Sequence, residues 1–181
     1  TVSITDKQLD EAAKAAEKDG SSHISIKVES AEGTNKVKVE LPKGSVASLA
    51  SQKGYDLIIE SAVGKVSIPN DLLSYLAEKG KGDKLTVSLE AVDTARLTDE
   101  QRQLVGDNPV YDISIESGGS FISSFDGKSI TISLPYTLKE GEKAEDVKVW
   151  YLNDAGELEL MDCTYDEKTG LATFTSSHLS Y

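Results

Sequence analysis

The segment whose residues could most directly carry out a reaction is Ser177-His178-Leu179-Ser180, close to the end of the chain. A histidine beside a strained peptide bond that precedes a serine can drive an N-to-O acyl shift and self-cleavage. In this segment Ser180 would be the nucleophile and His178 the activator. The simpler interpretation is that His178 caps or orients the final strand through a hydrogen bond of its side chain. We favour the simpler interpretation and keep self-cleavage as a third hypothesis.

Other catalytic arrangements are not supported by the placement of the residues they need. A nucleophilic triad requires a serine or cysteine, a histidine and a carboxylate brought together. The two histidines are His23, which opens a predicted strand, and His178, near the end of the chain, and the one cysteine is Cys163. Neither a nucleophile elbow nor a glycine-rich phosphate loop occurs. Carboxylates are numerous, but the aromatic residues that line sugar clefts make up only 6% of the chain. The sequence therefore predicts a protein that is not an enzyme, with no catalytic residues and no cofactor.

Two acidic turns contain oxygen ligands suited to calcium, although neither has an EF-hand pattern. The two groups are Asn153, Asp154, Glu157 and Asp162, and Asp166 with Glu167. Asp, Asn and Gly are also the residues that hairpin turns require, and we prefer that explanation. One thiol and two histidines are too few for a zinc site. We predict no metal site.

Trp150 and Tyr151 are the candidate binding residues, because exposed aromatic rings can stack on sugars. Adjacent residues of a strand point to opposite faces of the sheet. We therefore expect one ring in the core and the other at the surface or at an edge. Binding of a carbohydrate or a cell-wall polymer through these rings is the alternative function.

The charge balance limits the partners. Acidic residues outnumber basic ones by 31 to 19, which gives a net charge of −12. Such a surface repels nucleic-acid phosphates and anionic lipids, and no apolar run reaches membrane-spanning length. We expect no nucleic-acid partner and no membrane insertion. The charge is explained by solubility, with contact to divalent cations or cationic wall groups as a second interpretation.

The first half alternates helix and strand signals. Thr5 and Gln8 form a capping box ahead of a predicted helix from Asp6 to Lys18. Strand patterns follow at 23–28 and 36–41. An internal repeat comes next: Lys38-Val39-Glu40-Leu41-Pro42 matches Lys65-Val66-Ser67-Ile68-Pro69, and each copy reads strand, proline, short helix, turn, strand. We expect each proline in the first turn of its helix, where its missing N–H has no partner.

The second half is predicted to be nearly all strand, with short alternating runs and Asx- or Gly-containing turns. We therefore expect an α+β fold. Its predicted parts are an N-terminal mixed half with a duplicated strand-Pro-helix-strand unit (1–94), a connector (95–109) with a second capping box at Thr98 and Gln101, and a C-terminal antiparallel β-sandwich (110–181). The strands on both sides of the connector need partners, so we expect the halves to pack as one unit.

The residues that close the chain resemble a known family. A module in exported Firmicutes proteins that precedes surface-layer homology repeats is similar to Ile130 to Tyr136, Val147 to Leu152, Tyr165-Asp166 with Thr169-Gly170, and Phe174 to Tyr181. The capped helix and the strands that end at Leu41-Pro42 and Ile68-Pro69 are similar to the segment before that module, so the resemblance spans almost the whole chain. The second half is also distantly similar to the β-sandwich domain of ankyrins and netrin receptors, some relatives of which self-cleave at His-Phe-Ser, where this chain has Leu179.

The resemblance implies an extracellular location, at the cell wall or surface layer, and a non-catalytic structural role. The expected function is a spacer that presents or links functional domains. Its expected partners are cell-wall or surface-layer components, or neighbouring domains of the parent chain.

Overall fold

The chain folds into two β-sheets, a hairpin and a group of helices, as seen in a computed structural model that describes residues 1–153 and 155–179. The first sheet contains β1 (Val2–Ser3), β3 (Lys36–Pro42), β6 (Lys84–Ala91), β7 (Tyr111–Ser117) and β8 (Ser120–Phe121), in that spatial order. The second contains β12 (Cys163–Asp166), β13 (Leu171–Ser176), β9 (Ile130–Pro135), β5 (Gly64–Ile68), β4 (Asp56–Ser61) and β2 (His23–Lys27). β10 (Val149–Leu152) and β11 (Leu158–Met161) pair as a hairpin. The predicted α+β class is confirmed.

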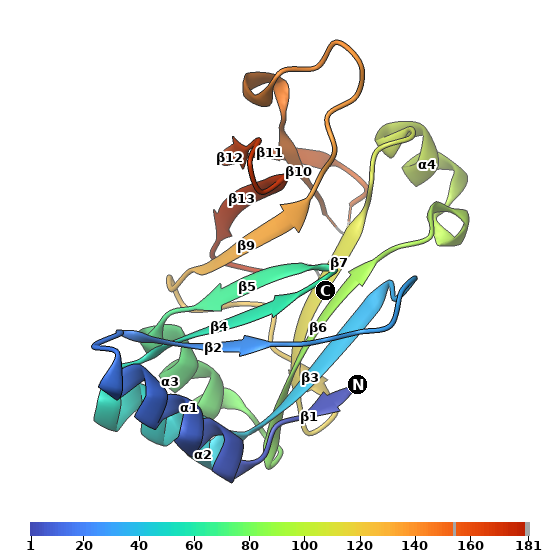
Figure 1. Cartoon of the computed structure of the whole chain (residues 1–181). Coiled ribbons are helices and arrows are strands. Elements are labelled where there is room, and N and C mark those ends of the chain that lie inside the picture. Colours follow the sequence, from blue (N-terminus) through green and yellow to red (C-terminus); the bar gives the residue numbers. More distant parts are fainter. Residues whose placement is uncertain (154, 180–181) are drawn as a thin grey trace.

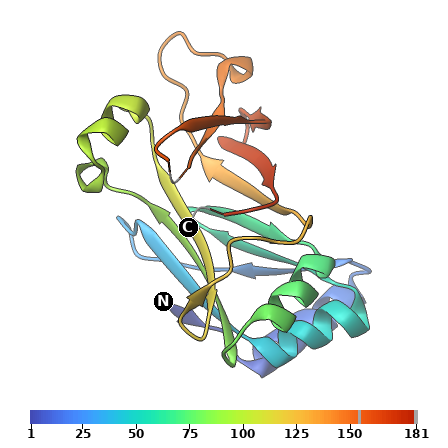
Figure 2. The ribbon, with the colours of Figure 1, turned by 180° about the vertical axis from the view of Figure 1, so that it is seen from behind.

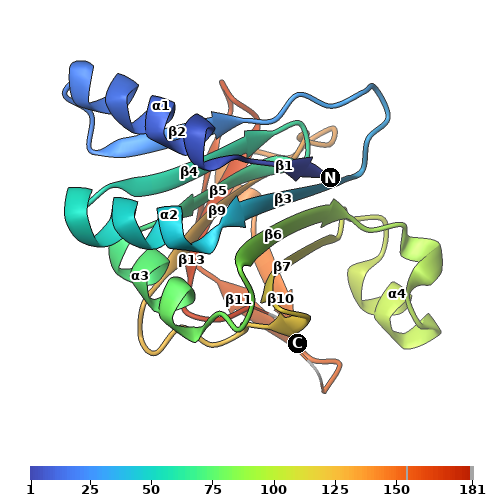
Figure 3. The same cartoon turned by 90° about the horizontal axis from the view of Figure 1, so that it is seen from below.

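Three helices lie side by side at one end of the sheets (Figures 1 and 3). They are α1 (Asp6–Lys18), α2 (Lys43–Ser48), which continues into the π-helical turn η1 (Leu49–Lys53), and α3 (Asn70–Lys79). Each connects a strand of one sheet to a strand of the other. α1 has its predicted bounds, and its capping box forms, with Thr5 accepting from the Gln8 N–H and Gln8 accepting from the Thr5 N–H.

The two copies of the repeat adopt the same structure with the sheets exchanged. β3-α2-β4 runs from the first sheet to the second, and β5-α3-β6 runs back. The pairing register repeats as well: Val39 opposes Val87, while Val66 opposes Ile59. Because equivalent residues pair in both places, the copies are related by an approximate two-fold axis.

Each proline of the repeat lies one position earlier than predicted. Pro42 and Pro69 are the N-cap residues of α2 and α3, with extended backbone and ψ angles of 117° and 156°. The expectation that they occupy the first helical turn is therefore wrong by one residue. Pro42 is still the last residue of β3, opposite Lys84, and a residue that completes a strand keeps the extended conformation.

A third unit of the same order precedes the repeat. β1 and β2 flank α1, and they pair in parallel with β3 and β4 respectively. The unit is thus a parallel neighbour of the first copy, one strand further out in each sheet. Its first strand has only two residues, too few to show an alternating pattern in the sequence.

Strands from both sides of the connector complete both sheets. β7 pairs with β6 in the first sheet, and β9 pairs with β5 in the second. The connector itself carries the turn η2 (Thr94–Arg96) and helix α4 (Asp99–Val105), which project from one side of the molecule (Figure 2). The boundary near residue 94 is therefore not a boundary between separate sheets.

The core lies between the two sheets and under the three helices. Aliphatic side chains dominate it, in keeping with the low aromatic content, and Phe125 is the largest fully buried side chain. Its most buried members, each at most 2% exposed, include Leu9, Ile24, Val39, Leu41, Leu57, Val66, Ile68, Leu72, Leu76, Leu85, Ile115, Ile130 and Ile132. Leu179, near the end of the chain, joins the same cluster.

Candidate functional site

The hairpin β10–β11 separates the two candidate aromatic residues. Trp150 is 53% exposed and lies opposite Leu160, which is 56% exposed. Tyr151 is half-buried and meets the His178 ring edge-on, with 4.9 Å between ring centroids. Trp150 and Tyr151 therefore do not form a common stacking platform. The structure instead pairs Trp150 with Leu160, which sequence analysis did not single out.

His178 serves the local structure of the chain end. Its backbone N–H donates to Ser176 Oγ, which in turn donates to the His178 carbonyl. His178 also forms a β-bridge with Ser124, and the next residue, Leu179, donates its N–H to the Ser123 carbonyl. The backbone thus holds this segment, and the His178 ring packs on Tyr151. Ser180, the nucleophile of the self-cleavage hypothesis, lies outside the described residues.

The side chains of the two acidic turns bond to their own backbones. Asn153 Oδ1 accepts from the Glu157 N–H at 2.9 Å, and Asp166 Oδ1 accepts from the Lys168 N–H at 2.9 Å. Such bonds are the usual reason for Asn and Asp in turns. Asp154 is outside the described residues. Among residues 1–153 and 155–179, no group of three or more His, Cys, Asp or Glu side chains is placed to hold a metal ion.

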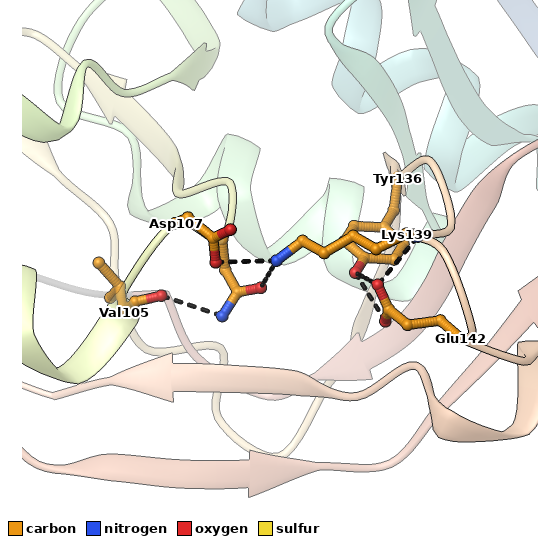
Figure 4. Close-up of polar contacts among 6 residues, drawn as sticks. Val105, Asp107, Tyr136, Lys139 and Glu142 are labelled. Carbon is orange, nitrogen blue, oxygen red and sulfur yellow. Dashed lines mark hydrogen bonds and ion pairs between the residues drawn. The ribbon is translucent and has the colours of Figure 1, made fainter.

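A polar network joins the connector, residues 95–109, to the loop that follows β9 (Figure 4). Lys139 Nζ donates to Asp107 Oδ1 at 2.9 Å and to Asn108 Oδ1 at 3.1 Å. The Tyr136 hydroxyl lies 2.7 and 2.8 Å from the two carboxylate oxygens of Glu142. Lys139 lowers the pKa of Asp107, and the hydrogen bond to Glu142 raises the pKa of Tyr136 to about 12. Lys139 therefore favours the ionised form of Asp107, and Glu142 favours the protonated form of Tyr136.

Two further tyrosines fix the end of β9. The Tyr111 hydroxyl, from β7, donates to the Pro135 carbonyl at 2.7 Å, and the Tyr165 hydroxyl, from β12, donates to the Tyr136 carbonyl at 2.6 Å. The Tyr136 and Tyr165 rings also meet edge-on at 6.1 Å. Tyr111 belongs to the first sheet and Tyr165 to the second, so hydroxyl groups join both sheets at one point. These tyrosines have a structural role.

A row of charged groups crosses the outer face of the first sheet. Lys36, Glu90 and Asp112 lie side by side on β3, β6 and β7. Lys36 Nζ is 3.2 Å from one Glu90 oxygen and Arg96 Nη1 is 2.5 Å from the other. Burial pushes the pKa of Glu90 upward, but the hydrogen bonds from Arg96 and Lys36 outweigh it and lower that pKa. Burial, followed by the neighbouring Glu90, raises the pKa of Asp112.

Sequence analysis missed this row because it depends on strand register. Glu90 and Asp112 lie in strands joined by the connector, so only pairing brings them together. The sequence carries no signal of this row, because charged residues at the polar positions of an alternating strand are the usual pattern of a solvent-facing side. The arrangement neutralises the Glu90 carboxylate with two cations, Lys36 and Arg96. It resembles a structural ion-pair cluster more than a reaction centre.

The surface of the described residues has two shallow depressions. One, of about 340 Å³, lies between the turns of residues 82–84 and 117–119, and another, of about 300 Å³, lies between α2 and α3. No helix among the described residues is long and apolar enough to cross a membrane.

The comparisons with known proteins add no relative: no family model, curated protein or solved structure matches the chain.

Proposed function

We propose that the chain is a non-catalytic structural module that holds other domains at a fixed spacing in a bacterial cell-surface protein. The observation that carries the proposal is the completion of both sheets by strands from both halves of the chain, through the β6–β7 and β5–β9 pairs. A spacer must not divide into parts under load. Strand pairs that connect distant parts of the sequence hold the two halves together and oppose such division.

The anchoring of the chain ends supports the same role. β1 pairs with β3 at the N-terminal end, while Leu179 is buried and hydrogen-bonded to Ser123 near the C-terminal end. Force applied at either end therefore acts on paired or buried segments. The location at the cell surface rests on the resemblance of the closing residues to modules of exported Firmicutes proteins, and the acidic composition is compatible with it.

Single-molecule stretching tests the mechanical role. The chain is placed between two marker domains of known unfolding length and pulled from both ends. A fully extended chain reaches about 3.6 Å per residue, so one cooperative event would release about 650 Å. Two events of about 340 and 260 Å, the extended lengths of residues 1–94 and 110–181, would contradict a single interlocked unit.

Cell fractionation tests the location separately. An antibody raised against the chain is used on cytosolic, membrane and wall fractions of the source cells. We expect the chain in the wall fraction and accessible to protease added to intact cells. Recovery from the cytosol alone would overturn the cell-surface part of the proposal and leave the mechanical part to the stretching experiment.

A further inference from the structure

The outer face of the β10–β11 hairpin is apolar. Trp150 and Leu160 oppose each other and are both more than half exposed. Leu152 and Leu158 form the next pair, and both are half-buried. Residues two apart in a strand share a face. The ribbon therefore presents four large apolar side chains on one side.

The attachment of the hairpin does not account for this face. The hairpin is held through its other side, where Tyr151 packs against His178, and through the preceding residue Val147, whose carbonyl accepts from Cys163 Sγ. The solvent side of an antiparallel ribbon normally carries polar residues. A tryptophan and a leucine side by side in that position indicate a surface that a partner covers.

The charges around the hairpin indicate the kind of partner. Residues 145–153 and 155–162 contain five acidic residues and one basic residue, Lys148. The acidic residues are Glu145, Asp146, Glu157, Glu159 and Asp162. A second copy of the chain, with its net charge of −12, would bring like charges together. A cationic partner is attracted instead, by the carboxylates and by the face of the indole ring.

The edges of the hairpin indicate the shape of the partner. β10 and β11 pair only with each other among the described residues. Backbone N–H and C=O groups along an unpaired edge accept an added strand. We propose that the hairpin binds an extended polypeptide segment rich in lysine or arginine, as an added strand. Its apolar side chains lie against Trp150 and Leu160, and its cationic side chains meet the surrounding carboxylates.

The sequence provides its own probe of this face, because Trp150 is the only tryptophan in the chain. The test ligand is an eight-residue peptide of alternating valine and lysine, and the matched control alternates valine and glutamate. The Val-Lys peptide is expected to shift Trp150 emission to shorter wavelength and to reduce quenching by acrylamide, with saturation. High salt is expected to weaken its binding, because salt screens exposed charges. The Val-Glu peptide is expected to change neither signal.

Variants locate the binding. Leu160→Ser removes the partner of Trp150 from the face and is expected to weaken binding about tenfold. Phe121→Ser is the matched control, since Phe121 is 58% exposed on β8 in the first sheet, and it is expected to bind as the parent does. Thermal unfolding checks that both variants fold.

Three outcomes would overturn the proposal: equal binding of the two peptides, unchanged binding by Leu160→Ser, or the same protection of Trp150 by neutral cell-wall oligosaccharides. Protection that rises with the concentration of the chain alone would identify a second copy as the occupant. The proposal goes beyond the mechanical role, and neither test depends on the other.

Discussion

Glu90 and Asp112 oppose each other on β6 and β7, yet they differ in their partners. Glu90 is held by Lys36 and Arg96, whereas Asp112 Oδ1 is a buried oxygen without a hydrogen-bond partner in the described part of the chain. Lys36 and Arg96 compensate the charge of Glu90, whereas Asp112 lies beside the negative charge of Glu90. Burial and Glu90 then raise the pKa of Asp112, so ionisation of Asp112 opposes folding.

Asp112→Asn is therefore expected to stabilise the protein at pH 7. The gain is about 0.5–1 kcal/mol, because the group is only half-buried and water screens it. The pKa of Asp112 is higher in the folded state than in the unfolded state. The contribution of protonated Asp112 to the free energy of unfolding is therefore complete below the unfolded-state pKa, and it is lost as pH rises through the folded-state pKa. The gain from the substitution should thus be absent near pH 3 and greatest at pH 7. Urea unfolding at a series of pH values measures it.

Glu116→Gln is the matched control for this substitution. It removes one negative charge from the same outer face of β7, in the row where Glu116 opposes Thr86 rather than an acidic residue. A similar stabilisation by both substitutions would show that overall charge reduction, and not the Glu90–Asp112 pair, is responsible.

Glu142→Gln is expected to lower the pKa of Tyr136 from about 12 toward its ordinary value of about 10. The hydrogen bond that the Tyr136 hydroxyl donates to the Glu142 carboxylate is the largest cause of the raised pKa, followed by burial and by the negative charge of Glu142. The substitution weakens the hydrogen bond and removes the charge. In the parent, the raised pKa gives stability that is complete below pH 10 and lost as pH rises through 12. The variant should lose less stability over that range. NMR titration of the Tyr136 ring, with Tyr165 followed in the same spectra, measures the pKa, and an unchanged value would contradict the hydrogen bond.

Local patterns predicted the helices and most strands because their determinants are local. The Thr5–Gln8 and Thr98–Gln101 capping boxes lie within one turn of the helices they start, and both form. Strand pairing depends instead on contacts across the whole chain. The β5–β9 pair, the Glu90–Asp112 neighbours and the parallel β1–β3 pair left no local signal. The pairing of Trp150 with Leu160 is more local, since β10 and β11 are consecutive strands, but it depends on the exact register of the hairpin.

The two capping boxes allow a matched test of how far each helix contributes to global stability. Loss of an N-cap side chain typically costs about 1 kcal/mol. α1 buries Leu9, Ala13 and Ala16, whereas α4 buries no residue. Thr5→Ala is therefore expected to lower the free energy of unfolding by about 1 kcal/mol. Thr98→Ala is expected to change it by less than about 0.5 kcal/mol, because the α4 segment can fray without global unfolding. Equal losses in chemical denaturation would show that α4 is part of the cooperative unit.

Gly82→Ala tests the close contact between two turns. A Cβ atom at Gly82 would lie 2.6 Å from the Gly118 nitrogen and 2.8 Å from its Cα, both backbone atoms. Ser117 Oγ reinforces this contact, since it accepts from the Gly82 N–H and donates to the Lys84 carbonyl. Backbone on both sides cannot move aside as a flexible side chain does, so we expect a loss of about 1–3 kcal/mol. Gly44→Ala is the control, because a Cβ there meets no atom within 4 Å and the residue lies in α2. It should be neutral or stabilising by about 0.5 kcal/mol. If thermal unfolding gave the two variants the same stability, the contact between the turns would have no energetic importance.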